Sequence, residues 1–114
     1  MPYFDVYTTR HLSAECKKCL QQQLGRIIEL IPGKSESWLM VQIHEDAYLS
    51  FAGSNAEPAA MVTLKTFGEL EKEHYDLLTA EICSCLHEVL QTEPTRIYVT
   101  YEPVVHWGWN SSNF

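Results

Sequence analysis

The chain has 114 residues, 46% of them hydrophobic and 20% charged, which suits one domain with one hydrophobic core. Eight Lys and Arg residues against fifteen Asp and Glu residues give a net charge of -7, which repels phosphate backbones and anionic headgroups, so we expect neither nucleic acid nor a membrane as a partner. No apolar run reaches the ~20 residues of a bilayer-spanning helix, and the chain starts without a signal-peptide pattern, so we expect a cytoplasmic protein.

The first half of the chain predicts a strand, a helix and a second strand. Residues 2–8 alternate between two faces and mix aromatic with β-branched residues, which is typical of a strand. From Ser13, a suitable N-cap, apolar residues recur at helical spacing until Pro32 and Gly33 end the pattern. Residues 38–44 are apolar enough for a strand that is buried on both faces.

The second half repeats this order roughly 58 residues later. Residues 59–66 alternate as a strand, residues 70–89 carry an apolar helical stripe, and residues 96–101 predict a last strand after Pro94. The predicted fold class is therefore α/β, with two βαβ units that form a four-stranded mixed sheet and place two helices on one face. The other face would expose Tyr, Trp and Met side chains, so we expect several copies to associate.

The end of the chain, residues 102–114, gathers aromatic side chains without a helical or strand period. It contains two Trp, one Phe and one His. Side chains of this size are usually buried. The sequence leaves open whether the domain's own core, a neighbouring subunit or a ligand covers them.

The four cysteines are predicted to be reduced structural thiols, because no secretion signal is present and they fit the helix faces that pack on the sheet. Two alternatives are open. Cys16 and Cys19 have the CxxC spacing of redox motifs. If the two helices are antiparallel, this pair also approaches Cys83 and His87, which would allow a zinc site. Because Cys83 and Cys85 point to opposite sides of their helix and no second ligand pair is present, we predict no metal and no cofactor.

The residue with the most distinctive chemistry is Pro2. A small second residue permits removal of Met1, and proline would then be the N-terminus with a free secondary amine. If apolar side chains bury this amine and a cation lies near it, its pKa falls and it becomes a general base near neutral pH. A Met-Pro start alone is a weak signal, because many proteins begin this way.

Further motifs accompany Pro2 in a fixed order. They are Gly33-Lys34 after the first helix, Phe51-Ala52-Gly53-Ser54 with Glu57-Pro58, Arg96-Ile97-Tyr98 in the last strand, and the ending Gly108 to Phe114 (GWNSSNF). With these motifs, residues 2–114 resemble the macrophage migration inhibitory factor family of the tautomerase superfamily. The resemblance implies a homotrimer of βαβ pairs and a cofactor-independent isomerase, a keto–enol tautomerase that acts on phenylpyruvate-like α-keto acids.

The resemblance also implies the roles of particular residues. Pro2 would be the catalytic base, and Lys34 would bind the substrate carboxylate. Phe67 and, from the adjacent subunit, Tyr98 would close the pocket. The other substrate-binding residues that it implies are the aromatic walls Trp38, Trp107, Trp109 and Phe114, together with Thr100.

The chain departs from the family's pattern at several of these positions. Thr100 stands where well-known members carry an asparagine, Trp38 replaces a rim tyrosine, and Phe67 is bulkier than the usual isoleucine. These changes bear on the substrate range. The redox CxxC of some members would fall near residues 59–62 and is absent, so we expect no oxidoreductase activity.

An alternative function is cytokine-like signalling. Some members of the family signal after export without a signal peptide, and in that case the partner would be a cell-surface receptor and the tautomerase pocket would be vestigial. Phenylpyruvate turnover by protein with a free Pro2 discriminates between the two functions.

Overall fold

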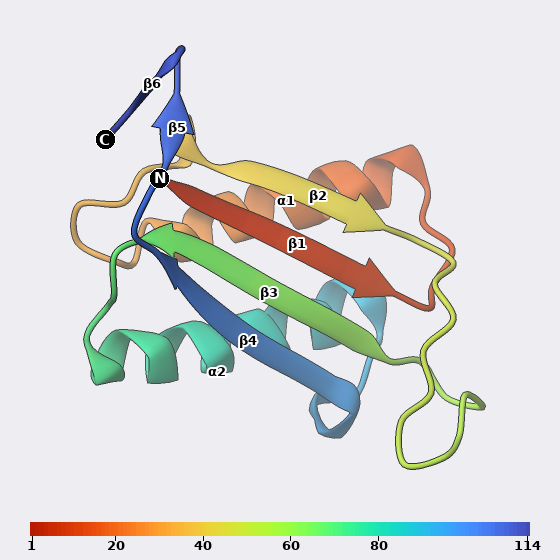
Figure 1. Ribbon diagram of the computed structural model, residues 1–114. Helices are drawn as coiled ribbons and strands as arrows, with labels where there is room; N and C mark the ends of the chain where they lie inside the picture. The colour runs from red at the N-terminus through yellow and green to blue at the C-terminus, as the bar shows by residue number, and fades with distance from the viewer.

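One four-stranded mixed sheet forms the framework of the molecule, seen in a computed structural model that describes residues 1–114 (Figure 1). Its spatial order is β2-β1-β3-β4. β1 runs parallel to β2, β3 runs parallel to β4, and the two pairs meet where β1 and β3 run antiparallel. The strands are β1 (Pro2–Thr8), β2 (Met40–His44), β3 (Ala60–Phe67) and β4 (Ile97–Val104). The two predicted βαβ units are thus confirmed.

Two helices, α1 (Ala14–Ile28) and α2 (Lys72–Leu90), cover one face of the sheet, behind the strands in Figure 1. Ser13 caps α1 as expected, and its Oγ accepts a hydrogen bond from the Cys16 N–H at 3.1 Å. The helix ends at Ile28, before the predicted stop at Pro32, because the chain tightens into a turn there. Neither helix combines the length and the apolar character that crossing a lipid bilayer requires.

The hydrophobic core lies between the helices and the sheet. Every second residue of β1 and β3 points into it, so that Phe4, Val6, Val62 and Leu64 have no exposed surface. The alternation read from residues 2–8 and 59–66 is therefore confirmed. A one-sided core fixes which face of each strand is left open.

The expectation of a strand buried on both faces over residues 38–44 is wrong. A short 3-10 helix, η1 (Glu36–Trp38), precedes β2, which begins only at Met40. Val41 and Ile43 pack against the core, whereas Met40 is 68% exposed. The helices cover only one face, so the apolar run divides between the core and the open face.

The aromatic tail, in which no strand period was visible, forms a small hairpin of β5 (Gly108–Trp109) and β6 (Ser112–Asn113). Its turn residues Asn110 and Ser111 both have positive φ, 50° and 68°, the backbone shape of a two-residue hairpin turn. Strands of two residues are too short to produce a periodic pattern. The hairpin projects from the sheet end where β1 begins (Figure 1).

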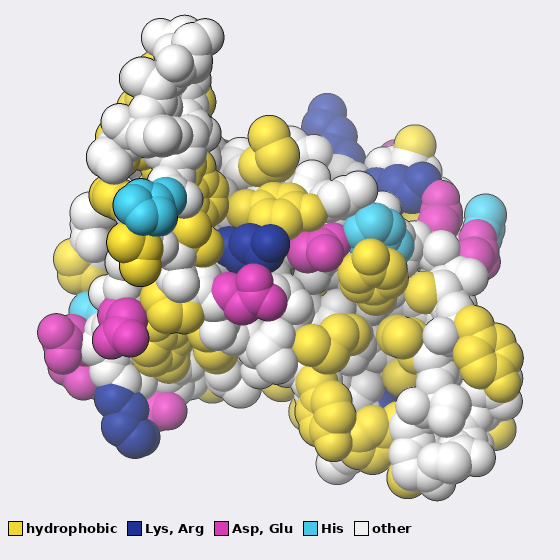
Figure 2. Space-filling view, viewed as in Figure 1, with side chains coloured by type: hydrophobic (Ala, Val, Ile, Leu, Met, Phe, Trp, Pro, Cys, Tyr) yellow, Lys and Arg dark blue, Asp and Glu magenta, His cyan; other side chains and the backbone are white.

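The open face of the sheet is organised in rows across the four strands. The pairing register sets the first row as Met40, Tyr3, Lys65 and Glu102, the second as Gln42, Asp5, Thr63 and Thr100, and the third as His44, Tyr7, Met61 and Tyr98. Figure 2 looks onto this face, where charged side chains lie in the middle and hydrophobic ones gather to either side. The predicted uncovered face with Tyr and Met side chains is therefore present.

Candidate active site

A cavity of about 670 Å³ opens at the sheet end where β1 starts. Eight of the 13 residues that line it are hydrophobic. Its walls come from the first residues of β1, from η1 and the start of β2, from β3, and from the tail, and include Pro2, Tyr3, Trp38, Met40, Lys65, Trp107 and Trp109. A mostly apolar hollow with a few polar groups is the usual form of a small-molecule site.

The start of the chain forms part of this cavity. Pro2 is buried as the first residue of β1, opposite Thr66 of β3. The Met1 carbonyl oxygen accepts a hydrogen bond from the Phe67 N–H at 3.2 Å, which fixes the first peptide unit against β3. Burial, and after it the positive charge of Lys34, lowers the pKa of the Met1 amino group from its ordinary value. The surroundings of the N-terminus thus favour an uncharged amine.

Lys34 lies beside the cavity and does not line it. The turn after α1 positions it, and its N–H donates to the Ile31 carbonyl at 3.1 Å. Its side chain is half-buried and close enough to the N-terminus to lower the pKa of that amine. The structure therefore brings Pro2 and Lys34 to the same end of the sheet.

Four of the expected aromatic residues form a connected series at this end. The ring of Trp38 meets that of Trp109 edge to face at 5.0 Å between centroids. Phe114 lies parallel to Trp109 at 6.4 Å and also contacts Phe67 at 5.6 Å. Aromatic pairs at such separations stabilise each other's orientation. The tail hairpin thus brings Trp109 and Phe114 to the two residues expected to rim the site.

The structure places Tyr98 and Thr100 elsewhere. Tyr98 packs on Phe51 at 5.4 Å, and the Thr100 hydroxyl is hydrogen-bonded to that of Thr63 at 3.1 Å. Pro103, which lies in line with Pro2 across the sheet, is five residues from Tyr98, or roughly 17 Å at the usual rise of a strand. Neither residue lines the cavity of its own chain, so the role expected of Tyr98 requires an adjacent subunit.

Sequence reasoning missed four polar residues of the cavity, which are Tyr3, Ser37, Lys65 and His106. Tyr3 donates its hydroxyl hydrogen to Gln42 Oε1 at 2.6 Å. The alternation of residues 59–66 does put Lys65 on the face away from the helices. The sequence does not reveal the pairing register of β1 and β3, which sets Lys65 beside Tyr3 and next to the N-terminus.

The structure does not gather the cysteines into a set of metal ligands. All four are free thiols, and the only group of three or more possible ligand side chains with donor atoms within 4.8 Å of one another is His11, Glu45 and Asp46. The geometry therefore does not bring together Cys16, Cys19, Cys83 and His87. Burial raises the pKa of the Cys83 thiol and, with smaller effects of nearby groups, that of Cys85 to about 12. These two thiols are poor nucleophiles at neutral pH.

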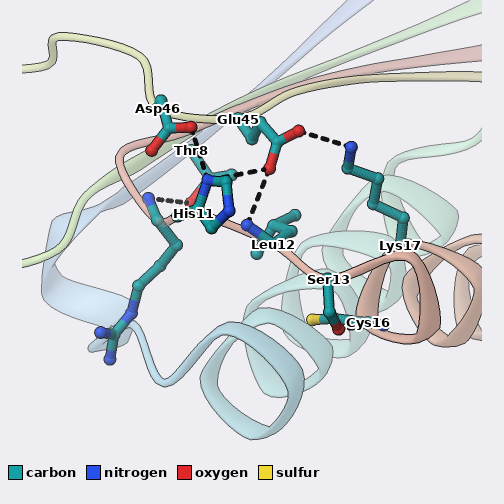
Figure 3. Close-up of polar contacts among 9 residues, drawn as sticks. Thr8, His11, Leu12, Ser13, Cys16, Lys17, Glu45 and Asp46 are labelled. Atoms are coloured by element: carbon teal, nitrogen blue, oxygen red, sulfur yellow. Dashed lines mark hydrogen bonds and ion pairs between the residues drawn. The ribbon is translucent and has the colours of Figure 1, made fainter.

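The exposed cluster of His11, Glu45 and Asp46 joins the loop before α1 to the end of β2 (Figure 3). His11 Nδ1 lies 2.8 Å from Asp46 Oδ2, and the Leu12 N–H donates to Glu45 Oε2 at 2.8 Å. Lys17 forms an ion pair with Glu45 from the first turns of α1. The cluster ties a loop to a strand at the opposite end of β1 from the cavity.

A sheet of two βαβ units, with the N-terminal strand opening into an apolar cavity, defines a protein of the tautomerase superfamily. The chain belongs to the macrophage migration inhibitory factor (MIF) family, whose model matches residues 1–114. The resemblance seen in the sequence and the fold that it implied are thus confirmed.

Solved structures show the same fold. MIF2 from Leishmania major is 30% identical over 100% of this chain and 97% of its own, with a TM-score of 0.93. The MIF homologue from Prochlorococcus marinus is 27% identical over 98% of each chain, with a TM-score of 0.87. A more distant structure, of Pt0534 inactivated by 2-oxo-3-pentynoate, is 23% identical over 90% of this chain and 85% of its own, with a TM-score of 0.79. Comparison with curated proteins gives no significant match.

Proposed function

We propose that this protein is a cofactor-independent keto–enol tautomerase that acts on phenylpyruvate-like α-keto acids, with Pro2 as general base after removal of Met1. The observation that carries the proposal is the position of Pro2, which is buried at the wall of an apolar cavity and follows an amino group, that of Met1, whose pKa is lowered by burial and by Lys34. We infer that the same surroundings lower the pKa of the Pro2 amine once Met1 is removed. An uncharged secondary amine in such a place is able to accept a proton near neutral pH.

The reaction moves one hydrogen from carbon to oxygen within the substrate. The Pro2 nitrogen takes a proton from the carbon next to the keto group, and the electron pair of that C–H bond moves into the enolate. The protonated Pro2 nitrogen then gives this proton to the enolate oxygen, which restores the uncharged amine and completes the isomerisation with no oxidant or reductant. Lys34 holds the substrate carboxylate as an ammonium–carboxylate pair.

The aromatic rim supports an aryl substrate. Trp38, Trp109, Phe114 and Phe67 lie in one connected series beside the N-terminus. Flat rings of this kind bind another ring by offset or edge contacts. Inactivation of the fold neighbour Pt0534 by 2-oxo-3-pentynoate supports 2-oxo acids as the compound class to test first.

The mechanism requires a free Pro2. While Met1 is attached, the proline nitrogen belongs to an amide and has no basic electron pair. Met1 also lines the cavity, so its removal both creates the base and enlarges the space in front of it. Removal of Met1 is therefore part of the proposal.

We further propose that three copies assemble through the part of the open sheet face that lies away from the cavity. The third row of that face presents Tyr7, Met61 and Tyr98, of which Tyr98 is 62% exposed. Apolar surface of this kind is commonly covered by a symmetric partner. Sedimentation equilibrium tests the assembly, and a monomer at micromolar concentration would contradict it.

The activity is tested with protein of verified intact mass. Protein that starts at Pro2 is expected to accelerate ketonisation of the enol of phenylpyruvate, followed by ultraviolet absorbance. Pro2→Gly leaves a primary amine of different basicity and should lower the rate severely while the protein stays folded. Equal rates for the two proteins would contradict the role of Pro2.

A further inference from the structure

We propose that Lys65 gives this cavity a second anion-binding group, so that the enzyme prefers α-keto acids that carry a second carboxylate at the end remote from the keto group. This inference rests on the proposed tautomerase function and specifies its substrate class. It concerns a different cation from Lys34, on a different element of the fold.

The position of Lys65 carries the proposal. It lies on β3 directly opposite Tyr3, one residue from the pair formed by Thr66 and Pro2. It is the only lining residue of the cavity with a permanently charged side chain, among eight hydrophobic ones. A lone cation in a mostly apolar hollow marks where the negative end of a ligand is best placed.

The ammonium group of Lys65 is available to a ligand. Its nearest acidic partner is Glu102, with 3.7 Å between Nζ and Oε2, which is longer than a charged hydrogen bond. Both side chains are about half exposed, at 42% and 57%, and such a pair contributes little to stability. On its other side Nζ lies 5.9 Å from the centre of the Tyr3 ring. These contacts orient the lysine without neutralising it.

Asp5, a second acidic residue of the open face, does not compete for Lys65. Asp5 lies in the next row of the open face, and its Oδ1 is 2.8 Å from His44 Nε2, which is further along the sheet. Figure 2 shows this grouping of basic, acidic and imidazole side chains in the middle of the face. Lys65 lines the cavity, so its positive charge remains available to a ligand there.

Two cations near the base define the substrate. Lys34 follows α1 and lowers the pKa of the Met1 amino group without lining the cavity, whereas Lys65 lines the cavity on β3. A substrate whose α-carboxylate pairs with Lys34 would turn its other end toward the interior. A second carboxylate there would form a charge-assisted hydrogen bond with Lys65, which phenylpyruvate itself does not supply.

The test compares phenylpyruvate with 4-carboxyphenylpyruvate, which differs only in the second carboxylate. Proton abstraction is followed by NMR as exchange of the C3 hydrogens with D2O above the uncatalysed rate. For wild-type protein that starts at Pro2, kcat/KM should be higher for the dicarboxylate. In Lys65→Met this preference should fall about tenfold, mainly through KM.

The ratio of the kcat/KM values for the two substrates isolates the effect of the second carboxylate, because any change in the base or in folding alters both rates together. Lys18→Met removes one charge from the exposed surface of α1 and should keep the wild-type ratio. Glu102→Gln removes the competing carboxylate and should raise the ratio. Lys65→Gln, a second neutral variant, should reproduce Lys65→Met if the charge rather than the shape matters.

A binding measurement separates this inference from the proposed function. Terephthalate should bind more tightly than benzoate in isothermal titration, and Lys65→Met should abolish the difference. Suppose that phenylpyruvate exchanges, but the ratio of the kcat/KM values for the two substrates is unchanged in Lys65→Met or lowered in Glu102→Gln. This result would overturn the role of Lys65 and leave the tautomerase function in place. No exchange of either substrate would overturn the tautomerase function, while the terephthalate preference would still decide whether Lys65 binds anions.

Discussion

Substitution of Lys34 by alanine separates the two roles that we propose for this residue. In the proposal its ammonium group holds the substrate carboxylate, and its charge, which lowers the pKa of the Met1 amino group, acts likewise on the amine of Pro2. A hydrogen bond between charged groups contributes about 1.5 to 3 kcal/mol. Because Lys34 is only half-buried, water screens the pair, and the lower end of that range applies. Lys34→Ala should therefore raise KM for phenylpyruvate about tenfold.

The same substitution should move the pH profile in a predictable direction. The base works only when it is uncharged, so kcat/KM rises with pH through the pKa of the free amine. Burial and Lys34 both lower the pKa of the Met1 amino group. If they act in the same way on the amine of Pro2, removal of Lys34 leaves burial alone. The acidic limb of the profile should thus shift to higher pH in Lys34→Ala, and kcat at high pH should change less than KM.

The assay is ketonisation of phenylpyruvate enol at several pH values, with protein whose mass shows that it starts at Pro2. Lys18→Ala serves as the matched control, because Lys18 is exposed on α1 and the same charge is lost. An unchanged KM together with an unchanged acidic limb in Lys34→Ala would refute both roles of Lys34.

Three predictions concern the parts of the fold that support the site. Ser13→Ala should lower the free energy of unfolding in urea by about 1 kcal/mol, because the N-cap hydrogen bond of α1 is lost; no change would show that water replaces it. The hydrogen bond to Asp46, and then the nearby carboxylate charges, raise the pKa of His11, so its stabilising effect is present below the unfolded pKa and disappears as pH rises through the folded one. His11→Ala should therefore lower Tm at about pH 5 and leave it unchanged at about pH 8, and equal losses at both would contradict this origin. Arg96 donates to four carbonyl oxygens of residues 51–58, so Arg96→Met should speed limited proteolysis of that loop, whereas unchanged cleavage would show that the loop holds its shape alone.

Much of the fold was predictable because its elements carry clear periods. The alternation in residues 2–8 and 59–66 and the cap at Ser13 are local properties, and each survives in the structure. The prediction of a strand buried on both faces over residues 38–44 is wrong, because some apolar residues of this run line the cavity or lie on the open face. The hairpin turn at Asn110 and Ser111 depends on positive φ values that a period cannot reveal.

The site was predictable only in part, because it depends on contacts between distant segments. Pro2 and Lys34 could be proposed from chemistry and resemblance, and the structure brings them to one end of the sheet. Lys65 could not, because only the antiparallel register of β1 and β3 sets it beside Tyr3. Tyr98 lies far along β4 from Pro2, and no pattern within one chain indicates which cavity it would serve.

The central claim is that a free Pro2 amine is the catalytic base, and one comparison tests it most directly. Protein that starts at Pro2 and protein that retains Met1 are prepared separately, identified by intact mass, and assayed with phenylpyruvate at equal concentration. The account predicts turnover by the processed form and none by the form with Met1, whose proline nitrogen is an amide. Full activity in the form with Met1 would contradict the proline mechanism.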